Sequence, residues 1–228
     1  MSSVMNVAAL FSGGKDSTYA VYQAQQQGFT VTHLVSIKSS SAHSWMFHSI
    51  NIHLVDLLAQ CLQIPLISAS SQGEKEVELD DLKQLLAPLP VEGVVSGAIA
   101  SKYQQLRINR ICQDLDIQSI TPLWMKNQET VLQEQISAGF DIVIVGVYAE
   151  GLDASWLGTH ITHKVIDELG DMNKKYGINI AGEGGEYETL VVDGPNFHQR
   201  LVLDKTEIQW KRDCGTLNVS EASIRKKD

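Results

Sequence analysis

The sequence predicts an α/β protein in which a doubly wound, mostly parallel sheet is followed by a smaller α+β domain. In the first half, short apolar runs alternate with segments of helical periodicity. Strands separated by helices pair in parallel through right-handed crossovers, which gives an open sheet covered by helices. From about residue 178, glycines instead punctuate short β-rich runs. We therefore expect two domains, over residues 1–124 and 125–228.

The elements of the first domain follow from periodicity and from the residues that end each run. Gly28 closes the first expected helix, while Pro88 and Pro90 end the third, because glycine favours helix C-termini and proline cannot continue a helix. β-branched residues in the apolar runs favour strands. The expected strands are 4–11, 30–37, 65–70, 91–96 and 117–121. The expected helices are 15–27, 50–62, 76–86 and 100–115.

The second domain begins with the same alternation and then changes character. The elements expected first are a helix over 129–138, a buried strand over 140–147, a loop over 151–158 and a helix over 160–176. The β-rich runs expected after them are 189–192, 199–203, 207–211 and 215–219. The charged end of the chain, 225–228, predicts a solvated tail.

Composition excludes several classes of protein. The chain has 228 residues, of which 43% are hydrophobic and 20% charged, so it is an ordinary globular protein that can bury a core without disulfides. Its formal net charge is -9. Because nucleic-acid binding needs clustered positive charge, we expect no direct nucleic-acid partner. The sequence leaves the oligomeric state open, and a homo-oligomer is compatible with it.

Cysteine usage and hydropathy predict a cytoplasmic protein. Cys61, Cys112 and Cys214 are far apart and odd in number, which supports neither a disulfide framework nor a metal knuckle. No apolar run approaches the ~18 residues that a membrane helix needs, so we expect no membrane association. The first seven residues carry no basic segment, so we expect no signal peptide.

The most informative motif lies between the first expected strand and the first expected helix. Glycines there allow positive φ and close backbone approach, and backbone N–H groups at a helix N-terminus attract phosphate. Two serine hydroxyls add donors and a lysine adds a cation. The one carboxylate makes sense beside phosphate if it binds Mg²⁺ or caps the helix. The motif consists of Ser12, Gly13, Gly14, Lys15, Asp16 and Ser17.

This loop differs from two familiar phosphate loops. Ala9 stands where a Walker A motif requires its first glycine, and the Gly-x-Gly-x-x-Gly fingerprint of dinucleotide sites is absent. The segment instead resembles the PP-loop of ATP pyrophosphatases, Rossmann-like proteins of the HUP class that split ATP into AMP and pyrophosphate. The resemblance implies that all six residues bind ATP and that Lys15 and Asp16 are catalytic, with Asp16 as the metal ligand.

The same resemblance excludes two chemistries found among PP-loop proteins. Many of them transfer sulfur to tRNA with paired cysteines, and here no cysteines are paired in sequence. Others carry a glutaminase domain, for which this chain has neither the room nor an N-terminal cysteine nucleophile. If ammonia is the nucleophile, it must therefore come from solution.

Three further segments narrow the family. One runs from Gly97 to Gln104 and on through Arg107 to Pro122-Leu123-Trp124, and another holds Gly151-Leu152-Asp153 and Trp156-Leu157-Gly158. The third is Gly182-Glu183-Gly184-Gly185-Glu186-Tyr187-Glu188-Thr189-Leu190, followed by Asp193-Gly194-Pro195. Together with the loop they resemble the diphthine–ammonia ligase family in its short, stand-alone form, over nearly the whole chain. Thr159 departs from the pattern, in which a basic residue follows Trp-Leu-Gly.

The resemblance implies ATP-dependent amidation of diphthine on translation elongation factor 2. ATP would adenylate the diphthine carboxylate, and free ammonia would displace AMP, giving diphthamide, AMP and pyrophosphate. A carboxylate is a poor electrophile until its oxygen becomes a good leaving group, and the loop with Mg²⁺ would stabilise charge moving onto pyrophosphate. Elongation factor 2 and ammonia are the implied partners, and we expect the site in a cleft between the two domains.

The other expected site residues lie in the three family segments. Arg107, at helical spacing from Arg110, would meet a phosphate of ATP or fix the domain interface. Acidic and aromatic side chains of the last two segments would hold the trimethylammonium group of diphthine. The loop 36–44, near the carboxyl edge of the sheet, is a candidate contact for adenine. The expected substrate-binding residues are Tyr103, Gln104, Asp153, Trp156, Glu183, Glu186, Tyr187 and Glu188.

Two other functions stay open at this point. Another PP-loop ligase would adenylate a small carboxylic acid or a nucleobase, and would form AMP without a protein acceptor. A nucleotide-binding regulatory module would bind ATP without turnover, since sheets of this kind also host such modules. Asp16 beside Lys15 argues against the module, because a passive sensor does not need that carboxylate.

Overall fold

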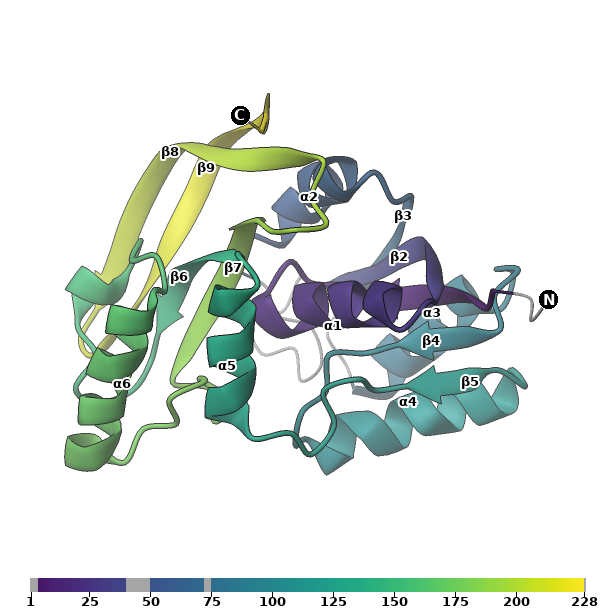
Figure 1. Ribbon diagram of the computed structural model, residues 1–228, viewed down its shortest axis with the longest axis horizontal. Helices are drawn as coiled ribbons and strands as arrows, with labels where there is room; N and C mark the ends of the chain where they lie inside the picture. Colours follow the sequence, from purple (N-terminus) through teal and green to yellow (C-terminus); the bar gives the residue numbers. More distant parts are fainter. Residues whose placement is uncertain (1–3, 40–49, 72–74, 228) are drawn as a thin grey trace. The chain divides into compact units, whose positions relative to one another are not determined.

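The computed structural model describes residues 4–39, 50–71 and 75–227, and the chain divides into two compact units. The first unit is Met1–Met125 and the second is Lys126–Asp228. Figure 1 labels their helices and strands, and each unit is described below by itself. The candidate adenine loop, 36–44, lies outside the described residues from position 40 onward.

The first unit is built on a five-stranded parallel sheet in the order β3-β2-β1-β4-β5 (Figure 1). The predicted doubly wound α/β fold is therefore confirmed. The strands are β1 (Asn6–Leu10), β2 (Thr30–Ser39), β3 (Leu66–Ser71), β4 (Gly93–Val95) and β5 (Gln118–Ile120). The helices are α1 (Lys15–Gln26), the short 3-10 helix η1 (Ile52–Leu54), α2 (Val55–Leu62), α3 (Lys75–Leu86) and α4 (Lys102–Asp114).

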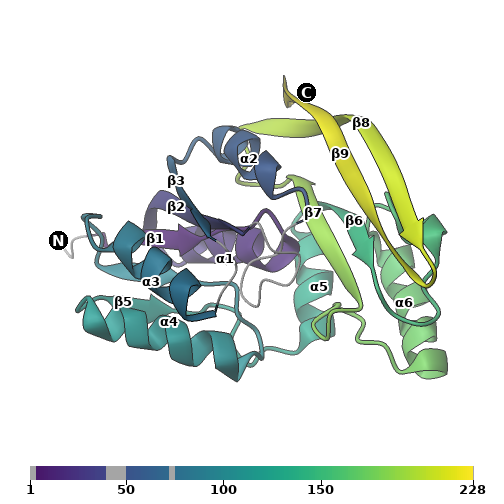
Figure 2. The same ribbon diagram turned by 180° about the vertical axis from the view of Figure 1, so that it is seen from behind.

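The core of the first unit lies on both faces of the central strand β1. Because alternate side chains of a strand point to opposite faces, Ala8 and Leu10 share one face. They pack there with Leu82 of α3 and Ile108 of α4, whereas α1 lies on the other face (Figures 1 and 2). Each fully buried leucine or isoleucine stabilises the folded state by roughly 1.5–3 kcal/mol. This packing therefore holds the sheet and its carboxyl edge in place.

The chain reverses its direction across the sheet at β1. It runs outward from β1 through β2 to β3, then crosses back to β4 on the other side of β1. The loops that follow β1 and β4 therefore leave neighbouring strands toward helices on opposite faces. Open α/β sheets bind ligands at the carboxyl end of the strands at such a switch point. In this chain the segment 12–17 follows β1 at that position.

The second unit is an antiparallel sheet with helices packed against it. Strand order is β7-β6-β9-β8, and α5 and α6 contact each other beside it (Figure 2). The helix N-termini are capped by side chains, Asn127 accepting from the Thr130 N–H and Thr162 from the Val165 N–H. The elements are α5 (Gln128–Ser137), β6 (Asp141–Val147), the short 3-10 helix η2 (Ala154–Trp156), α6 (His163–Tyr176), β7 (Tyr187–Asp193), β8 (Gln199–Lys211) and β9 (Cys214–Lys226).

The structure corrects the expected break within β8. The separate runs 199–203 and 207–211 are one continuous strand. Strand β9 pairs along its whole length and tolerates two register shifts around Lys205. The polar residues between the two runs suggested a turn, but cross-strand hydrogen bonding holds them in the ladder.

The structure also corrects the solvated tail expected at 225–228. Strand β9 continues through Lys226. The Lys227 ammonium lies 2.7 Å from the Asp193 carboxylate and donates hydrogen bonds to the carbonyls of Gly194 and Phe197. A charge with three oxygen partners is fixed rather than solvated, so the last strand is tied down almost to the end of the chain.

Within the described part of the chain, no helix combines the length and the apolar character needed to cross a membrane.

Candidate active site

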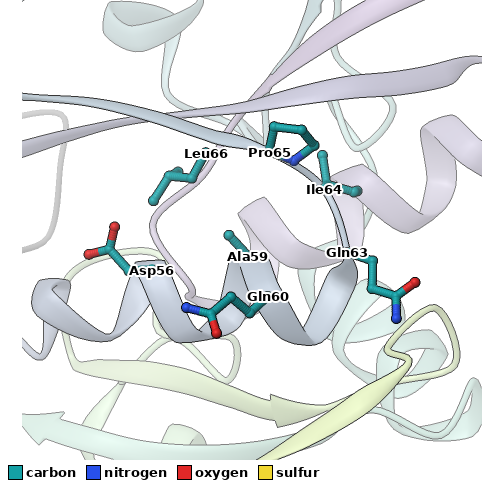
Figure 3. Close-up of a pocket in the computed structure, with 7 residues that line it drawn as sticks. All are labelled: Asp56, Ala59, Gln60, Gln63, Ile64, Pro65 and Leu66. Atoms are coloured by element: carbon teal, nitrogen blue, oxygen red, sulfur yellow. The ribbon is translucent and has the colours of Figure 1, made fainter.

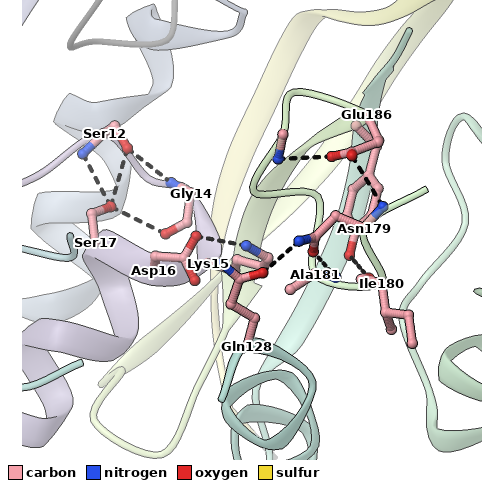
Figure 4. Close-up of polar contacts among 12 residues, drawn as sticks. Ser12, Gly14, Lys15, Asp16, Ser17, Gln128, Asn179, Ile180, Ala181 and Glu186 are labelled. Carbon is pink, nitrogen blue, oxygen red and sulfur yellow. Dashed lines mark hydrogen bonds and ion pairs between the residues drawn. The ribbon is translucent and has the colours of Figure 1, made fainter. Parts of the chain in front are cut away.

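The segment Ser12–Ser17 forms a closed loop at the N-terminus of α1 (Figure 4). The hydroxyl oxygens of Ser12 and Ser17 are 3.1 Å apart. Ser17 Oγ also accepts from the Ser12 N–H at 3.3 Å and donates to the Gly14 carbonyl at 3.1 Å, and the Gly14 N–H donates to Ser12 Oγ at 3.4 Å. Gly13 has φ +79°, a conformation that favours glycine. The loop is therefore shaped by its own hydrogen bonds before any ligand arrives.

The two serine hydroxyls have a different part from the one expected. The sequence suggested that they point donors at phosphate, but both bond within the loop. The first amide groups of a helix have no acceptor inside it and carry partial positive charge. In this geometry the helix N-terminus of α1 supplies the anion-binding character, and Ser12 and Ser17 hold the loop that leads to it.

Lys15 and Asp16 form the charged pair of the loop. Lys15 Nζ lies 2.6 Å from Asp16 Oδ2 (Figure 4), and the side chains are 7% and 24% exposed. The N-cap residue of α1 is Gly14, which makes no side-chain cap hydrogen bond, and Asp16 is the second residue of the helix. The helix-cap explanation for Asp16 is therefore wrong. An almost buried lysine beside a phosphate loop supplies fixed positive charge where phosphate would sit.

The loop can hold a magnesium ion in one way only, with a single carboxylate and with substrate phosphates and water as the other ligands. No group of three or more His, Cys, Asp or Glu side chains able to hold a metal occurs among the residues that the structure describes. Mg²⁺ is commonly bound by one or two carboxylates together with substrate phosphates and water rather than by an all-protein cage. Asp16, partly exposed at the helix N-terminus, fits that mode of binding.

Gly97, which follows β4, packs against the loop from the neighbouring strand. A Cβ atom at this position would lie 2.7 Å from the Asp16 carbonyl carbon and 2.7 Å from the Ser17 nitrogen. Such distances leave room for glycine alone unless the backbone moves. The sequence had placed Gly97 in a family segment without giving it this task. Its position two residues after β4, a strand next to β1, was the signal that could have revealed it.

Two buried serines flank the segment between β1 and the loop. Ser36 of β2 is 0% exposed and Ser96, directly after β4, is 3% exposed. Ser36 follows Val35, whose carbonyl accepts the Phe11 N–H. Among the residues described, neither hydroxyl has a hydrogen-bond partner. Buried hydroxyls are nearly always satisfied, so an orphaned pair on either side of β1 fits a polar ligand at this edge of the sheet.

Helix α4 carries the expected residues Tyr103, Gln104 and Arg107. The Arg107 guanidinium carbon lies 3.5 Å from the centre of the Tyr103 ring, so each side chain orients the other through a cation–π contact. The Gln104 N–H donates to Ser101 Oγ, the N-cap of the helix. The structure thus joins Tyr103 and Arg107 as a pair and fixes the helix end on which all three lie.

A hollow of about 360 Å³ lies elsewhere in the first unit (Figure 3). It is open to solvent and lies beside α2 and the start of β3, whereas the phosphate loop follows the end of β1. None of the predicted site residues lines it; the lining residues are Asp56, Ala59, Gln60, Gln63, Ile64, Pro65 and Leu66.

In the second unit, the Glu186 carboxylate braces the glycine-rich loop that precedes β7. One oxygen accepts the Asn179 N–H at 3.0 Å and the other accepts the Gly184 N–H at 2.8 Å (Figure 4). The Asn179 side chain in turn accepts the Ala181 N–H and donates to Gln128 of α5. Glu186 was expected to contact substrate, but its hydrogen bonds make it an organiser of this loop.

Tyr187 is buried and belongs to the same brace. The ring is 3% exposed, and its hydroxyl donates to the Ile180 carbonyl at 2.7 Å. Gly182, with φ +72°, lies directly against the ring, because a Cβ there would be 3.0 Å from the nearest ring carbon. Tyr187 was expected to offer an aromatic face to the substrate. At this depth it has no such face to offer, and it instead fixes the loop that carries Glu183.

The segment after β6 holds the remaining expected residues. Asp153 is exposed and caps η2, since its carboxylate accepts both the N–H and the hydroxyl of Ser155. These hydrogen bonds lower the pKa of Asp153. Trp156 is half-buried at the end of the same turn. Thr159 donates its hydroxyl to the Ser155 carbonyl, so at this position it closes the turn.

Sequence reasoning missed Tyr148, which the structure brings beside Glu188. Tyr148 follows β6, is 41% exposed and donates its N–H to the Glu186 carbonyl at 2.8 Å. Burial of its hydroxyl end, the Glu188 carboxylate and then Cys214 raise its pKa far above the ordinary value. Nothing in the local sequence distinguishes this tyrosine, because its neighbours come from distant strands.

The comparisons with known proteins cover nearly the whole chain. Residues 5–119 match the family model of the diphthamide synthase N-terminal domain, and residues 127–224 match that of the C-terminal domain. Cattle (Bos taurus) and human proteins named diphthine–ammonia ligase are each 34% identical over 230 residues, covering 90% of this chain and 85% of their own. The chain belongs to the diphthine–ammonia ligase family.

Longer members of the diphthine–ammonia ligase family contain a region that matches nearly the whole of this chain. The fission yeast (Schizosaccharomyces pombe) protein of that name is 33% identical over 224 residues, which cover 90% of this chain but 37% of the yeast protein. The two alternative functions, a ligase for a small acid and a regulatory module, find no support among these relatives. The family resemblance drawn from the loop and the three segments is confirmed.

Proposed function

We propose that this protein is a diphthine–ammonia ligase that converts the diphthine carboxylate of elongation factor 2 into an amide, using ATP and free ammonia. The observation that carries the proposal is the loop 12–17: a self-closed, glycine-containing loop with a buried lysine at a helix N-terminus. It stands in a chain whose two halves match the two diphthamide synthase domains.

ATP binds to the first unit in this proposal. The N-terminus of α1 and the Lys15 ammonium attract the phosphates, while Ser12, Gly13, Gly14 and Ser17 keep the loop in shape. The orphaned hydroxyls of Ser36 and Ser96 would find acceptors on the nucleotide. Arg107, held by the Tyr103 ring, would meet a phosphate as the expected further cation, and Gln104 would reach the substrate from the same helix.

The chemistry has two displacement steps. An oxygen of the diphthine carboxylate attacks the α-phosphorus of ATP; a P–O bond forms there and the bond to pyrophosphate breaks. The nitrogen of ammonia then attacks the acyl carbon, AMP leaves with the C–O electron pair, and the nitrogen releases a proton to solvent. The protein's part is to hold the carboxylate in line and to stabilise charge on the leaving pyrophosphate, for which Lys15 is placed.

Magnesium would add to that charge stabilisation. When bound, the ion would neutralise phosphate oxygens and make pyrophosphate a better leaving group. Asp16 is the residue of the loop that would hold it, and the Lys15 ammonium lies 2.6 Å from this carboxylate. Lys15 and Asp16 are therefore the proposed catalytic residues of this chain.

The second unit binds the protein acceptor in this proposal. Its braced loop presents Glu183 at a fixed position, because Glu186 and Tyr187 tie both ends of the loop to backbone groups. Asp153, Trp156 and Glu188 are proposed to contact the acceptor from neighbouring turns and strands. Their acidic and aromatic character suits the cationic diphthine side chain.

We place the enzyme in the cytoplasm, where elongation factor 2 is found. No disulfide joins Cys61, Cys112 or Cys214 in the described part of the chain, and two of the three are buried, as a reducing compartment allows. With ammonia taken from solution, no dedicated base is required, because the small neutral fraction of ammonium reacts.

The test is release of AMP and pyrophosphate from ATP, Mg²⁺ and ammonium, with and without elongation factor 2 bearing diphthine, alongside the mass of the acceptor. Acceptor-dependent AMP together with the mass change from acid to amide would support the proposal. AMP formed only with small carboxylic acids, or nucleotide bound without turnover under every acceptor, would contradict it.

A further inference from the structure

Strand pairing in the second unit places Tyr148 and Glu188 on one face of the sheet. Gly146 of β6 pairs with Glu188 of β7 in antiparallel register. Side chains two apart on a strand share a face, so Tyr148, two residues beyond Gly146, lies on the same face as Glu188. Diagonal neighbours in this arrangement are within reach of aromatic and long side chains.

Gly146 contributes no side chain between these two residues. It also pairs with Thr216 of β9 on its other side, so the face around position 146 is bordered by Tyr148, Glu188 and Thr216. With no Cβ at position 146, no side chain of β6 stands on this face between the positions of Tyr148 and Glu188. The Glu188 carboxylate is near enough to the Tyr148 hydroxyl to help raise its pKa, after burial, which is the larger cause.

The ring of Tyr148 is anchored and yet accessible. Its backbone is held by the hydrogen bond from its N–H to the Glu186 carbonyl, which is part of the braced loop. The residue keeps 41% of its surface exposed, in contrast to Tyr187, which is buried. An exposed aromatic face next to a carboxylate, on a rigid sheet, is the usual composition of a site for a quaternary ammonium group.

We propose that Tyr148 and Glu188 bind the trimethylammonium group of the diphthine side chain and so select the methylated acceptor; this rests on the proposed function. A quaternary ammonium has no N–H and cannot be recognised by hydrogen bonds. It is recognised by the negative face of an aromatic ring and by nearby negative charge.

The site assigns different tasks to the acidic residues of the glycine-rich segment. Both carboxylate oxygens of Glu186 accept hydrogen bonds from backbone amides, and this fixes the start of β7. Glu188, two residues on, lies on the sheet face that carries the exposed Tyr148. Tyr148 therefore supplies the aromatic face for the trimethylammonium group, a role that the sequence analysis had expected of Tyr187.

The test compares Tyr148→Leu, Tyr148→Phe and Glu188→Gln with the wild type in acceptor-dependent amide formation. Loss of the ring should raise the KM for elongation factor 2 bearing diphthine by about 3- to 30-fold, with ATP affinity unchanged, and Tyr148→Phe should retain the wild-type KM. Tyr176→Leu, at a tyrosine 37% exposed in the same unit, is the matched control and should leave this KM unchanged.

Tetramethylammonium chloride serves as the probe of the cation site itself. It should inhibit the wild type in competition with the acceptor, beyond the effect of equal sodium chloride, and should inhibit Tyr148→Leu and Glu188→Gln less. An unchanged KM and unchanged inhibition in both variants would overturn the inference while leaving the ligase function standing.

Direct binding separates the inference from the proposed function. Chemical-shift changes on titration of the wild-type protein with tetramethylammonium, lost in Tyr148→Leu, would support the cation site even if the wild type formed no amide. Absence of both turnover and binding in the wild type would overturn the inference and the proposed function together. If Tyr148→Leu fails to fold, the same comparison is made with Glu188→Gln.

Discussion

Gly97 lies in backbone contact with Asp16, so that a Cβ on Gly97 would sit 2.7 Å from the Asp16 carbonyl carbon. The contact joins the segment after β4 to the first turn of α1. Through this contact, the segments that follow β1 and β4 pack together at the carboxyl edge of the sheet. The position of the phosphate loop thus depends on a residue more than a strand and a helix away in sequence.

Gly97→Ala is expected to displace the N-terminus of α1. Overpacking against backbone typically lowers the free energy of unfolding by about 1–3 kcal/mol, and a shift of the loop should weaken ATP binding or turnover by roughly 10- to 100-fold. Isothermal titration with ATP and a urea unfolding curve measure the two effects. Gly170→Ala is the control: it lies in α6 with nothing within 4 Å of an added Cβ, so it should stabilise the helix slightly.

Asp16→Asn is expected to abolish AMP formation while the protein stays folded. The change removes the carboxylate that would hold magnesium and that lies 2.6 Å from the Lys15 ammonium. Release of AMP and pyrophosphate is the measurement, with circular dichroism to check the fold. Asp56→Asn is the control, because its ion pair with Lys38 is half-exposed and should matter by less than about 1 kcal/mol. Wild-type turnover in Asp16→Asn would remove the loop carboxylate from the mechanism.

The phosphate loop could be predicted from sequence because its conformation is local. Gly13 takes a positive φ and the hydroxyls of Ser12 and Ser17 meet across five residues, so the six-residue motif contains nearly all the information. The same holds for the parallel sheet of the first unit, whose alternation of apolar runs and helices is visible along the chain.

Tyr148 and Gly97 could not be predicted in this way because their surroundings depend on pairing between distant segments. Tyr148 meets Glu188 through the register of β6 on β7, forty positions apart in the chain. The sequence predicted that Glu186 and Tyr187 contact the substrate, because a sequence cannot distinguish side chains that brace a loop from side chains that face a ligand. That distinction rests on which backbone amides lie nearby.

Glu186→Ala is expected to loosen the loop before β7. The change leaves the N–H groups of Asn179 and Gly184 without their carboxylate acceptor, which costs about 1–3 kcal/mol where such groups are shielded from water. Hydrogen exchange at these two amides should accelerate, and amidation of the protein acceptor should fall while ATP binding is retained. Glu150→Ala, at an exposed carboxylate of the same unit, is the control and should change neither. Unchanged exchange at Gly184 would contradict the bracing role.

The raised pKa of the buried Cys112 thiol predicts that the free energy of unfolding falls at alkaline pH. The thiol is 2% exposed in α4, and burial raises its pKa from 9.0 to about 11. Between these two values the unfolded chain releases the thiol proton while the folded chain keeps it, so the folded state is increasingly disfavoured as pH rises. The contribution is fully present below pH 9 and lost by about pH 11, and it amounts to roughly 3 kcal/mol at most.

Urea unfolding of the wild type and Cys112→Ala at several pH values between 8 and 11 measures this effect, with those pH values spanning the two pKa values of the thiol. The variant should be less stable at pH 8, because a buried side chain is shortened. Since the other titrating groups are common to both proteins, the difference should shrink or reverse toward pH 11. Cys214→Ala, which removes a half-exposed thiol, is measured beside it as the control for loss of a cysteine. A constant difference between wild type and Cys112→Ala across this range would show that the thiol of Cys112 ionises equally in the folded and unfolded chains.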